Sequence, residues 1–319
     1  MNRGLLSVVV PAYNEETIVR KAAVVITELL TDAGIPFELL FVDDGSRDET
    51  WDIISSVSAQ YSTVRGIRFS RNFGKEAAIM AGLELAKGDC CVVLDCDLQH
   101  PPEKIIQMYR LWEQGYEIVE GHKNKRGTES KAHTLAANAF YAVISAVTGC
   151  NMANASDFKL LDRKAVDVLI TMRERDGFFR ALSSWIGFRT IGIEFDVQDR
   201  ESGTSKWSPF ALAKYAISNI TAFSAAPMQV VTVLGVIMLV SSMILGGMTL
   251  HEKLCGQAPE GFTTVILIQL FSSSIIMISL GIIGYYIAKI YEEIKGRPRF
   301  IITETCGENA HETTAQKTP

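Results

Sequence analysis

The chain has 319 residues, of which 48% are hydrophobic and 21% are charged, and its formal net charge is −5. This length is enough for one large domain or two modest ones. The acidic balance argues against a nucleic-acid partner held by a basic patch. The charges are unevenly spread, since residues 215–250 and 262–288 contain no Asp, Glu, Lys or Arg.

The first part of the chain alternates short β-branched runs with amphipathic stretches. The runs predict strands at Leu6–Val10, Leu39–Val42, Val64–Phe69, Cys91–Leu94 and Ile118–Glu120. The stretches predict helices at Glu15–Leu30, from the N-cap Asp48 to Ser58, at Lys75–Ala86, and from Pro101 and Pro102 onward. Such alternation predicts an α/β fold, with a mainly parallel sheet covered by helices on both faces.

The later part of the chain is more helical. Helices are predicted at Ala136–Val147 and Arg163–Met172, and a strand at Arg189–Phe195. The apolar stretch Trp207–Ala225, which carries Lys214, is expected to lie at a membrane interface.

Either charge-free run could cross a bilayer, which takes about 20 helical residues. Positive charges follow the second run, whereas the connection His251–Gly261 carries one lysine and two glutamates. By the positive-inside rule both termini are expected in the cytosol. The N-terminus lacks the features of a signal peptide, which also favours a cytosolic first domain. The expected organisation begins with a cytosolic domain at 1–206 and interface helices at 207–227. Transmembrane helices follow at 228–250 and 262–288, joined by an outer loop at 251–261. A cytosolic tail at 289–319 ends the chain and is expected to be disordered from Gly307 onward.

The six cysteines form no C-x-x-C pair. They are Cys90, Cys91, Cys96, Cys150, Cys255 and Cys306. We interpret them as small hydrophobic residues in a reducing compartment.

Polar motifs follow the first four predicted strands. They read PAYNEE, DDGS, SRNFGKE and DCD in chain order. Because active sites in such sheets lie at the carboxyl ends of the strands, these motifs are expected to meet there.

Asp95 and Asp97 form a D-x-D at the end of the fourth strand. Two carboxylates at this spacing can converge on Mg²⁺ or Mn²⁺ and leave coordination positions open for phosphate oxygens. Solvated loop acids are the competing interpretation, but the place of the motif between CCVVL and HPPE favours a site. Of Asp43 and Asp44, one could bind a base or ribose while the other stabilises an Asx-type turn.

Taken together, the motifs VVVPAYNEE, LFVDDGSRDET, SRNFGKEAAIMAGLELAKGD, LDCDLQHPPE and RESGTSKWS resemble family 2 glycosyltransferases in order and spacing. More narrowly, the chain resembles the polyprenyl-phosphate glycosyltransferases, which include dolichyl-phosphate mannose synthases and bacterial undecaprenyl-phosphate glucosyltransferases. The segment GYYIAKIYEEIKGRPRFII is similar to the bacterial branch. The resemblance covers about residues 5–302 and implies a GT-A, Rossmann-like nucleotide-diphospho-sugar transferase domain.

The resemblance also implies roles for residues on the donor side. Pro11, Tyr13, Glu15, Asp95 and either Asp43 or Asp44, with Asp44 preferred, would bind the nucleotide-sugar. Asp95, Asp97 and Gln99 would hold the divalent ion. His100 departs from the acid found in relatives, which read DLQDPPE, and no ligand role is expected for it.

On the acceptor side, a lipid phosphate needs cations beside an anionic diphosphate. By resemblance, Arg126, Arg200 and Lys206 are the expected phosphate binders, and Lys123 and Lys131 are equally well explained as solvated loop residues. Asp157 is expected to position the sugar, because an ionised phosphate acceptor has little need of a general base. Asp97, Asp157, Arg200 and Lys206 are therefore the expected catalytic residues.

The expected reaction is a metal-assisted, inverting transfer from a nucleotide-sugar to a polyprenyl phosphate at the cytosolic face of a bacterial inner membrane. UDP-glucose and undecaprenyl phosphate are the first candidates by analogy, and a homo-oligomer is a further expectation from the family. A processive polysaccharide synthase is an alternative, but the R/Q-x-x-R-W motif of such enzymes is missing from the sequence. A second alternative is a non-catalytic, membrane-anchored nucleotide-sugar sensor. The aromatic residues Phe178, Phe179, Trp185 and Phe188 are expected to pack in a core or against a membrane.

Overall fold

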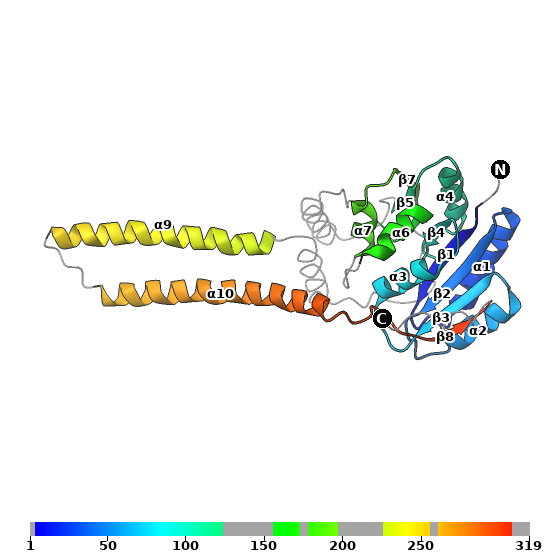
Figure 1. Cartoon of the computed structure of the whole chain (residues 1–319), viewed down its shortest axis with the longest axis horizontal. Coiled ribbons are helices and arrows are strands. Elements are labelled where there is room, and N and C mark those ends of the chain that lie inside the picture. The colour runs from blue at the N-terminus through cyan, green and yellow to red at the C-terminus, as the bar shows by residue number, and fades with distance from the viewer. Residues whose placement is uncertain (1–3, 124–155, 173–177, 197–225, 256–260, 308–319) are drawn as a thin grey trace. The chain divides into compact units, whose positions relative to one another are not determined.

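The computed structural model describes residues 4–123, 156–172, 178–196, 226–255 and 261–307 (Figure 1). The chain divides into two compact units, Met1–Leu212 with Pro298–Pro319, and Ala213–Arg297. The first unit holds a sheet and the second holds two long helices, and each is described by itself.

A sheet of eight described strands forms the first unit, in the order β7-β5-β6-β4-β1-β2-β3-β8. The strands are β1 (Leu6–Ala12), β2 (Phe37–Asp43), β3 (Val64–Phe69), β4 (Cys90–Val93), β5 (Ile118–Lys123), β6 (Lys159–Asp162), β7 (Thr190–Phe195) and β8 (Ile302–Cys306). β4, β1, β2 and β3 are parallel neighbours, as are β5 and β7, whereas β6 and β8 run antiparallel to theirs. The predicted α/β fold with a mainly parallel sheet is therefore confirmed.

Helices cover both faces of this sheet (Figure 1). Alternate residues of β1 point to opposite faces. Leu6, Val8 and Val10 join the core beneath α1 (Val19–Asp32), α2 (Thr50–Gln60) and α4 (Glu103–Glu113). On the other face Val9 meets α3 (Lys75–Leu85), so closely that a Cβ added at Gly82 would lie 2.2 Å from Val9 Cγ1. The helices α6 (Arg163–Thr171) and α7 (Phe179–Trp185) contact α3.

The predicted strands β1 to β5 and helices α1 to α4 are present, with ends that differ by at most four residues. Thr50 begins α2, and its N-cap is Glu49 rather than the predicted Asp48. Asp48 still supports the first turn, because its Oδ1 accepts from the backbone N–H and the hydroxyl of Thr50. The predicted helix at Ala136–Val147, the interface segment Trp207–Ala225 and residues 308–319 lie outside the described part of the chain.

Three elements were not predicted from the sequence: β6, α7 and β8. β8 is short and largely polar, and it pairs antiparallel with β3 at the edge of the sheet. Its Glu304 accepts hydrogen bonds of 2.9 Å from both Trp51 Nε1 and Arg68 Nη1. A segment that the sequence assigned to a tail therefore completes the sheet.

Three of the described cysteines are buried. Cys90, Cys91 and Cys96 are free thiols with at most 3% exposure. Burial raises the pKa of the Cys91 thiol to about 12, so it remains protonated at neutral pH. These three pack as small hydrophobic residues, as predicted. The prediction is wrong for Cys255, which is exposed, and Cys306 is only partly buried, while Cys150 lies outside the described residues.

The second unit contains α9 (Ala226–Leu254) and α10 (Phe262–Ile294). Met228–Met248 and Ile268–Ile294 are long and apolar enough to cross a membrane, judged by length and composition. Large apolar side chains on both helices are exposed, including Met243 at 70% and Met277 at 68%. Helices with such surfaces need an apolar partner or a lipid environment.

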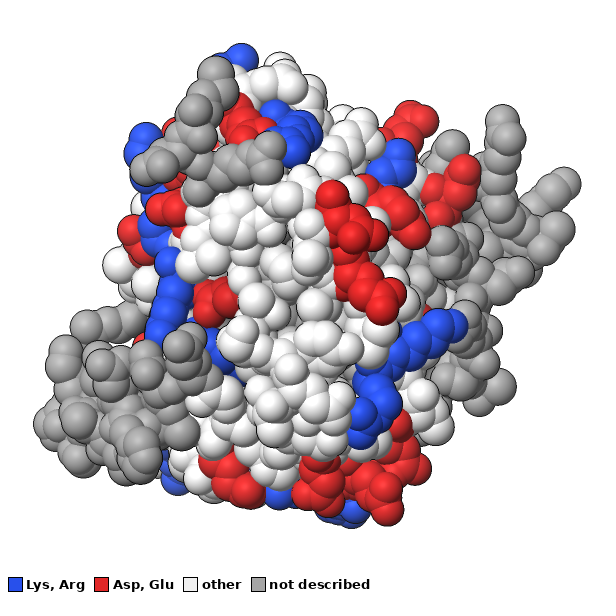
Figure 2. All heavy atoms as spheres, turned by 90° about the vertical axis from the view of Figure 1, so that its right-hand side faces the viewer, with Lys and Arg blue, Asp and Glu red and all other residues white. Residues whose placement is uncertain are grey.

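The charged surface of the described residues is mixed. On the face shown in Figure 2, Lys and Arg side chains are interspersed with Asp and Glu around a largely uncharged centre. Such alternation is typical of a solvated surface.

Candidate active site

The loops that follow β1, β2, β3 and β4 meet at the carboxyl edge of the sheet and enclose a cleft of about 340 Å³. The cleft is lined by Pro11, Ala12, Tyr13, Glu15, Asp44, Asn72, Gly74, Lys75, Ala78, Asp95, Cys96 and Asp97. Parallel strands bring these loops together because all their carboxyl ends lie at one edge. Every motif predicted from the first four strand ends therefore contributes to the same cleft.

The loops after β1 and β2 are joined by hydrogen bonds. Asn14 adopts a left-handed backbone with φ of 55°, its N–H donates to Ser46 Oγ at 2.9 Å, and its Oδ1 accepts from the Arg47 N–H at 3.0 Å. The Glu15 N–H donates to Thr50 Oγ1 at 2.9 Å. An asparagine tolerates this backbone conformation better than most residues. These contacts hold the PAYNEE segment in one shape.

The adjacent acids Asp43 and Asp44 have different partners. Asp43 is fully buried, its Oδ1 accepts from the Ser46 N–H at 3.0 Å, and its Oδ2 lies 3.3 Å from Arg68 Nε. It therefore supplies the turn contact that the sequence left open between the two acids. Asp44 lines the cleft, and its two oxygens accept from the backbone N–H groups of Phe73 and Gly74 at 2.6 and 2.9 Å. Burial raises the pKa of both carboxyls.

The D-x-D motif lies directly after β4, with both carboxylates at the cleft. Asp97 Oδ1 accepts from the Gln99 N–H at 3.1 Å, and Leu98 between them has a strained φ of 54°. Gln99, which the sequence predicts as a ligand of the divalent ion, thus contacts the motif through its backbone N–H. His100 stacks on Phe158 with ring centroids 5.2 Å apart, and burial lowers its pKa.

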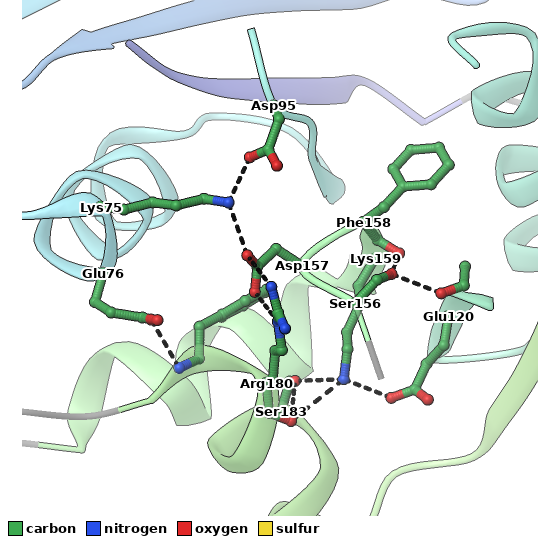
Figure 3. A network of polar contacts seen from close by, with 12 residues as sticks. Lys75, Glu76, Asp95, Glu120, Ser156, Asp157, Phe158, Lys159, Arg180 and Ser183 are labelled. Carbon is green, nitrogen blue, oxygen red and sulfur yellow. Dashed lines mark hydrogen bonds and ion pairs between the residues drawn. The ribbon is translucent and has the colours of Figure 1, made fainter. Parts of the chain in front are cut away.

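Asp157 lies beside the D-x-D motif because β6 runs antiparallel to β4, with Lys159 opposite Val93. Two cations hold its carboxylate (Figure 3). Lys75 Nζ lies 2.7 Å from Oδ2, while Arg180 Nε and Nη2 donate to the two oxygens at 2.6 and 2.9 Å. Burial alone would raise the pKa of Asp157, but the two cations hold it well below its usual range. Asp157 is therefore an ionised and rigidly oriented acid.

Lys75 also reaches Asp95, with Nζ 2.6 Å from Oδ1. It thereby bridges the D-x-D motif and Asp157 (Figure 3). Burial would lower the pKa of Lys75, but the two carboxylates raise it well above its ordinary value. The ammonium is charged at every physiological pH.

Behind this bridge lies a second set of charged groups. Glu76 accepts from the Phe179 N–H at 2.9 Å, and burial, reinforced by Asp157, raises its pKa to about 7. Lys159 is fully buried, and its Nζ lies 2.6 Å from Glu120 Oε1 and 2.8 Å from Ser183 Oγ (Figure 3). Glu76 and Lys159 thus each bind α7, the helix that carries Arg180, and Lys159 also binds Glu120 of β5.

The structure brings most of the predicted donor-side residues together. Pro11, Tyr13, Glu15, Asp44, Asp95 and Asp97 line one cleft. Asp157 is joined to it through Lys75. The predicted phosphate binders Arg126, Arg200 and Lys206 lie outside the described residues.

Sequence reasoning missed Lys75, Arg180 and the Lys159–Glu120 pair. A signal existed for Lys75, because SRNFGKE follows the third strand and was expected at the cleft. No comparable signal existed for Arg180, which reaches Asp157 from a short helix 23 residues along the chain. Of the aromatic residues in α7, Phe179 lies in the core with 0% exposure, whereas Trp185 lies on the surface with 60% exposure.

The chain is similar in sequence to known proteins. The sequence model of glycosyl transferase family 2 matches residues 7–169. The chain is 36% identical to the uncharacterized glycosyltransferase YkcC of Bacillus subtilis, over 94% of both chains. It is 32% identical to the SfII prophage-derived bactoprenol glucosyl transferase of Shigella flexneri, over 94% of this chain and 98% of that one. Among solved structures, the chain is similar to glucosyl-3-phosphoglycerate synthase of Mycobacterium tuberculosis in complex with Mn²⁺, uridine-diphosphate and glucosyl-3-phosphoglycerate. The TM-score is 0.48 and the identity 20%, and the match covers 70% of this chain and 78% of that one. With its family match and with relatives that align over nearly its whole length, the chain belongs to glycosyl transferase family 2 and is a glycosyltransferase.

Proposed function

We propose that the chain transfers a hexose from a nucleotide-sugar to a polyprenyl phosphate at the cytosolic face of a membrane. UDP-glucose and undecaprenyl phosphate are the first candidates for donor and acceptor. The observation that carries the proposal is the junction of the Asp95–Asp97 cleft with the clamped carboxylate of Asp157. The similarity to several bactoprenol glucosyl transferases supports the acceptor class. The apolar helices α9 and α10 support membrane insertion.

The donor side of the reaction falls to residues that line the cleft. We assign the nucleotide to Pro11, Tyr13, Glu15 and Asp44, which lie on the loops after β1 and β2. Asp43 acts from beneath, because its buried carboxylate shapes the turn that presents Asp44. Tyr13 is 40% exposed at the cleft, so its ring is accessible for stacking on a base.

The donor set at the end of β4 fits a hard divalent cation. Asp95 and Asp97 offer carboxylate oxygens, which Mg²⁺ and Mn²⁺ prefer, and both face the cleft. Among the described residues no group of three or more His, Cys, Asp or Glu side chains is placed to hold a metal. Two carboxylates leave coordination positions open, which diphosphate oxygens of the donor would fill. When bound, the cation stabilises the charge that develops on the leaving nucleoside diphosphate.

The remaining chemistry depends on alignment. Asp157, held by Lys75 and Arg180, orients the sugar through its hydroxyl groups. An oxygen of the acceptor phosphate attacks the anomeric carbon, the bond to the diphosphate oxygen breaks, and the anomeric configuration inverts. Because the acceptor is already ionised, no proton has to be removed from it. Arg126, Arg200 and Lys206 are proposed to bind the acceptor phosphate. Catalysis comes mainly from proximity and electrostatic stabilisation.

The test is a transfer assay with the purified full chain in detergent. The chain is incubated with undecaprenyl phosphate, Mg²⁺ or Mn²⁺, and a panel of UDP- and GDP-sugars, and the glycolipid is identified by mass spectrometry. One donor should give a metal-dependent product. Asp97→Ala should lower the rate by about 100-fold or more, the scale expected for losing an electrostatic contact to the transition state. The matched control is Asp52→Ala, which removes an exposed acid on α2.

Two outcomes would contradict the proposal. Full activity of Asp97→Ala would remove the metal role of the D-x-D motif. Binding of a nucleotide-sugar without turnover on any polyprenyl phosphate would favour the non-catalytic sensor.

A further inference from the structure

Lys75 is the first residue of α3, and its ammonium stands between two carboxylates of different function (Figure 3). Its Nζ lies 2.6 Å from Asp95 Oδ1 and 2.7 Å from Asp157 Oδ2. The Asp95 oxygen is therefore already paired with a cation of the protein itself. Any second cation at that oxygen has to displace the ammonium or repel it.

The two ends of the bridge are unequal. Asp157 is 5% exposed and holds Arg180 by two hydrogen bonds in addition to Lys75. Asp95 is 25% exposed, and apart from Lys75 its nearest basic side chain among the described residues is His100, 3.9 Å away, whose pKa is lowered by burial. Since exposed ion pairs are weak, the Lys75–Asp95 contact is the one that opens at low cost. Lys75 then stays attached to Asp157.

We propose that Lys75 is a displaceable counter-ion of the cation site, one that occupies Asp95 until the nucleoside diphosphate and the divalent cation bind together. This inference rests on the proposed function, because it takes Asp95 as a ligand of the cation. A divalent ion alone meets two carboxylates, one of which is already neutralised by the ammonium. A nucleoside diphosphate adds negative charge and oxygen ligands, which favour the divalent ion over the ammonium. Binding of the cation and of the nucleotide is therefore coupled, and the coupling is reciprocal.

Lys75 has one role before the donor binds and another afterwards. Before the donor arrives, the ammonium keeps Asp95 and Asp157 from repelling each other across the cleft. After the donor has bound, Lys75 remains on Asp157 and faces an anionic diphosphate. The same residue thus disfavours cation binding in the empty site and supports the donor complex.

The experiment measures Mn²⁺ binding directly, by the electron paramagnetic resonance signal of free Mn²⁺, on the full chain in detergent with and without UDP. The wild type should bind Mn²⁺ at least tenfold more tightly when UDP is present. Lys75→Met keeps the aliphatic stem and removes the charge, so it should bind Mn²⁺ about tenfold more tightly than wild type without UDP. The gain produced by UDP should shrink by the same factor. Lys75→Arg, which keeps a cation, should retain the wild-type coupling.

Lys164→Met is the control, because Lys164 is an exposed cation of α6 outside the bridge, and it should bind Mn²⁺ as the wild type does. Lys75→Gln provides a second neutral variant should methionine disturb folding, since an amide can still donate to Asp157. Equal or weaker Mn²⁺ binding by both neutral variants without UDP would overturn the inference. The transfer assay on the same samples separates the two proposals. If the neutral Lys75 variants bind Mn²⁺ more tightly than the wild type but the wild type makes no glycolipid, the proposed function alone is refuted. If the wild type makes glycolipid but the neutral variants bind Mn²⁺ no more tightly, this inference alone is refuted.

Discussion

Replacing Lys159 by methionine should be among the most destabilising single changes in the sheet-containing unit. Lys159 is fully buried, and it faces Glu120 directly across the β5–β6 ladder, with Nζ 2.6 Å from Oε1. Its remaining hydrogen bonds go to α7, at Ser183 Oγ, Ser184 Oγ and the Arg180 carbonyl oxygen. Methionine fills the same volume but leaves the Glu120 carboxylate buried without its cation.

The expected magnitude follows from that unpaired charge. Breaking a buried pair by removing one partner costs about 3–5 kcal/mol, against about 5–15 kcal/mol for the stability of a typical domain. Removing both charges should cost far less, because apolar replacements of similar volume are often neutral. Burial lowers the pKa of Lys159 despite the nearby carboxylate, which indicates that desolvation offsets much of the attraction in this pair. The double variant Glu120→Met/Lys159→Met should therefore recover most of the loss.

The assay is urea unfolding of the full chain in detergent, followed by tryptophan fluorescence, for the wild type, both single variants and the double variant. A double-mutant cycle then isolates the coupling free energy between positions 120 and 159. Wild-type stability of Lys159→Met, or a double variant whose loss equals the sum of the single losses, would refute the reasoning.

Three further predictions follow from the same network and its loops. Because the folded pKa of Glu76 is raised from 4.5 to about 7, the folded chain binds the proton more tightly and wild-type stability should fall as pH rises from 5 to 8. Glu76→Gln should remove that fall, so its free energy of unfolding should rise by up to about 3 kcal/mol relative to wild type between pH 5 and 8. If urea unfolding gives the two proteins parallel profiles of stability against pH, the prediction is wrong. Gly45→Ala should cost more stability than Gly187→Ala, although their φ values are similar at +67° and +69°. At Gly45 the Cβ would clash with backbone, 2.5 Å from the Arg71 carbonyl carbon, whereas at Gly187 the nearest atom is the Trp185 carbonyl oxygen at 3.9 Å, an ordinary contact. The Gly187 variant should lose about 1–2 kcal/mol, and equal losses in thermal unfolding would contradict the steric argument. Asp157→Asn should lower kcat by about 100-fold with little change in UDP affinity, since an amide cannot pair with both cations, and a loss confined to KM would argue for a role in binding alone.

The regular first part of the fold was predictable because its signals are local. The strands β1 to β5 contain short hydrophobic runs, and β1, β2 and β4 are buried along their whole length. Their parallel order brings the strand ends to one edge, so the cleft could be predicted from the position of PAYNEE, DDGS, SRNFGKE and DCD. The family was likewise readable, because it depends on the order of these motifs.

The elements that escaped prediction are short and depend on distant partners. β6 has four residues, and it forms because β4 and β5 flank it on both sides. β8 comes from a polar segment that is ordered by pairing with β3 and by the contacts of Glu304. Neither segment carries a hydrophobic pattern strong enough to specify a strand by itself.

The sequence by itself determined the fold class, the family, and the acids that line the cleft, because these follow from the hydrophobic pattern and from motifs at strand ends. Only the tertiary structure decided which charges meet. Lys75 and Arg180 converge on Asp157, although they lie 82 residues before it and 23 residues after it in the chain. An antiparallel strand places Asp157 beside the D-x-D motif, and a helix held by a buried lysine carries Arg180. Ion pairing acts over a few ångströms of space whatever the separation along the chain, so the pattern of residues alone could not reveal it.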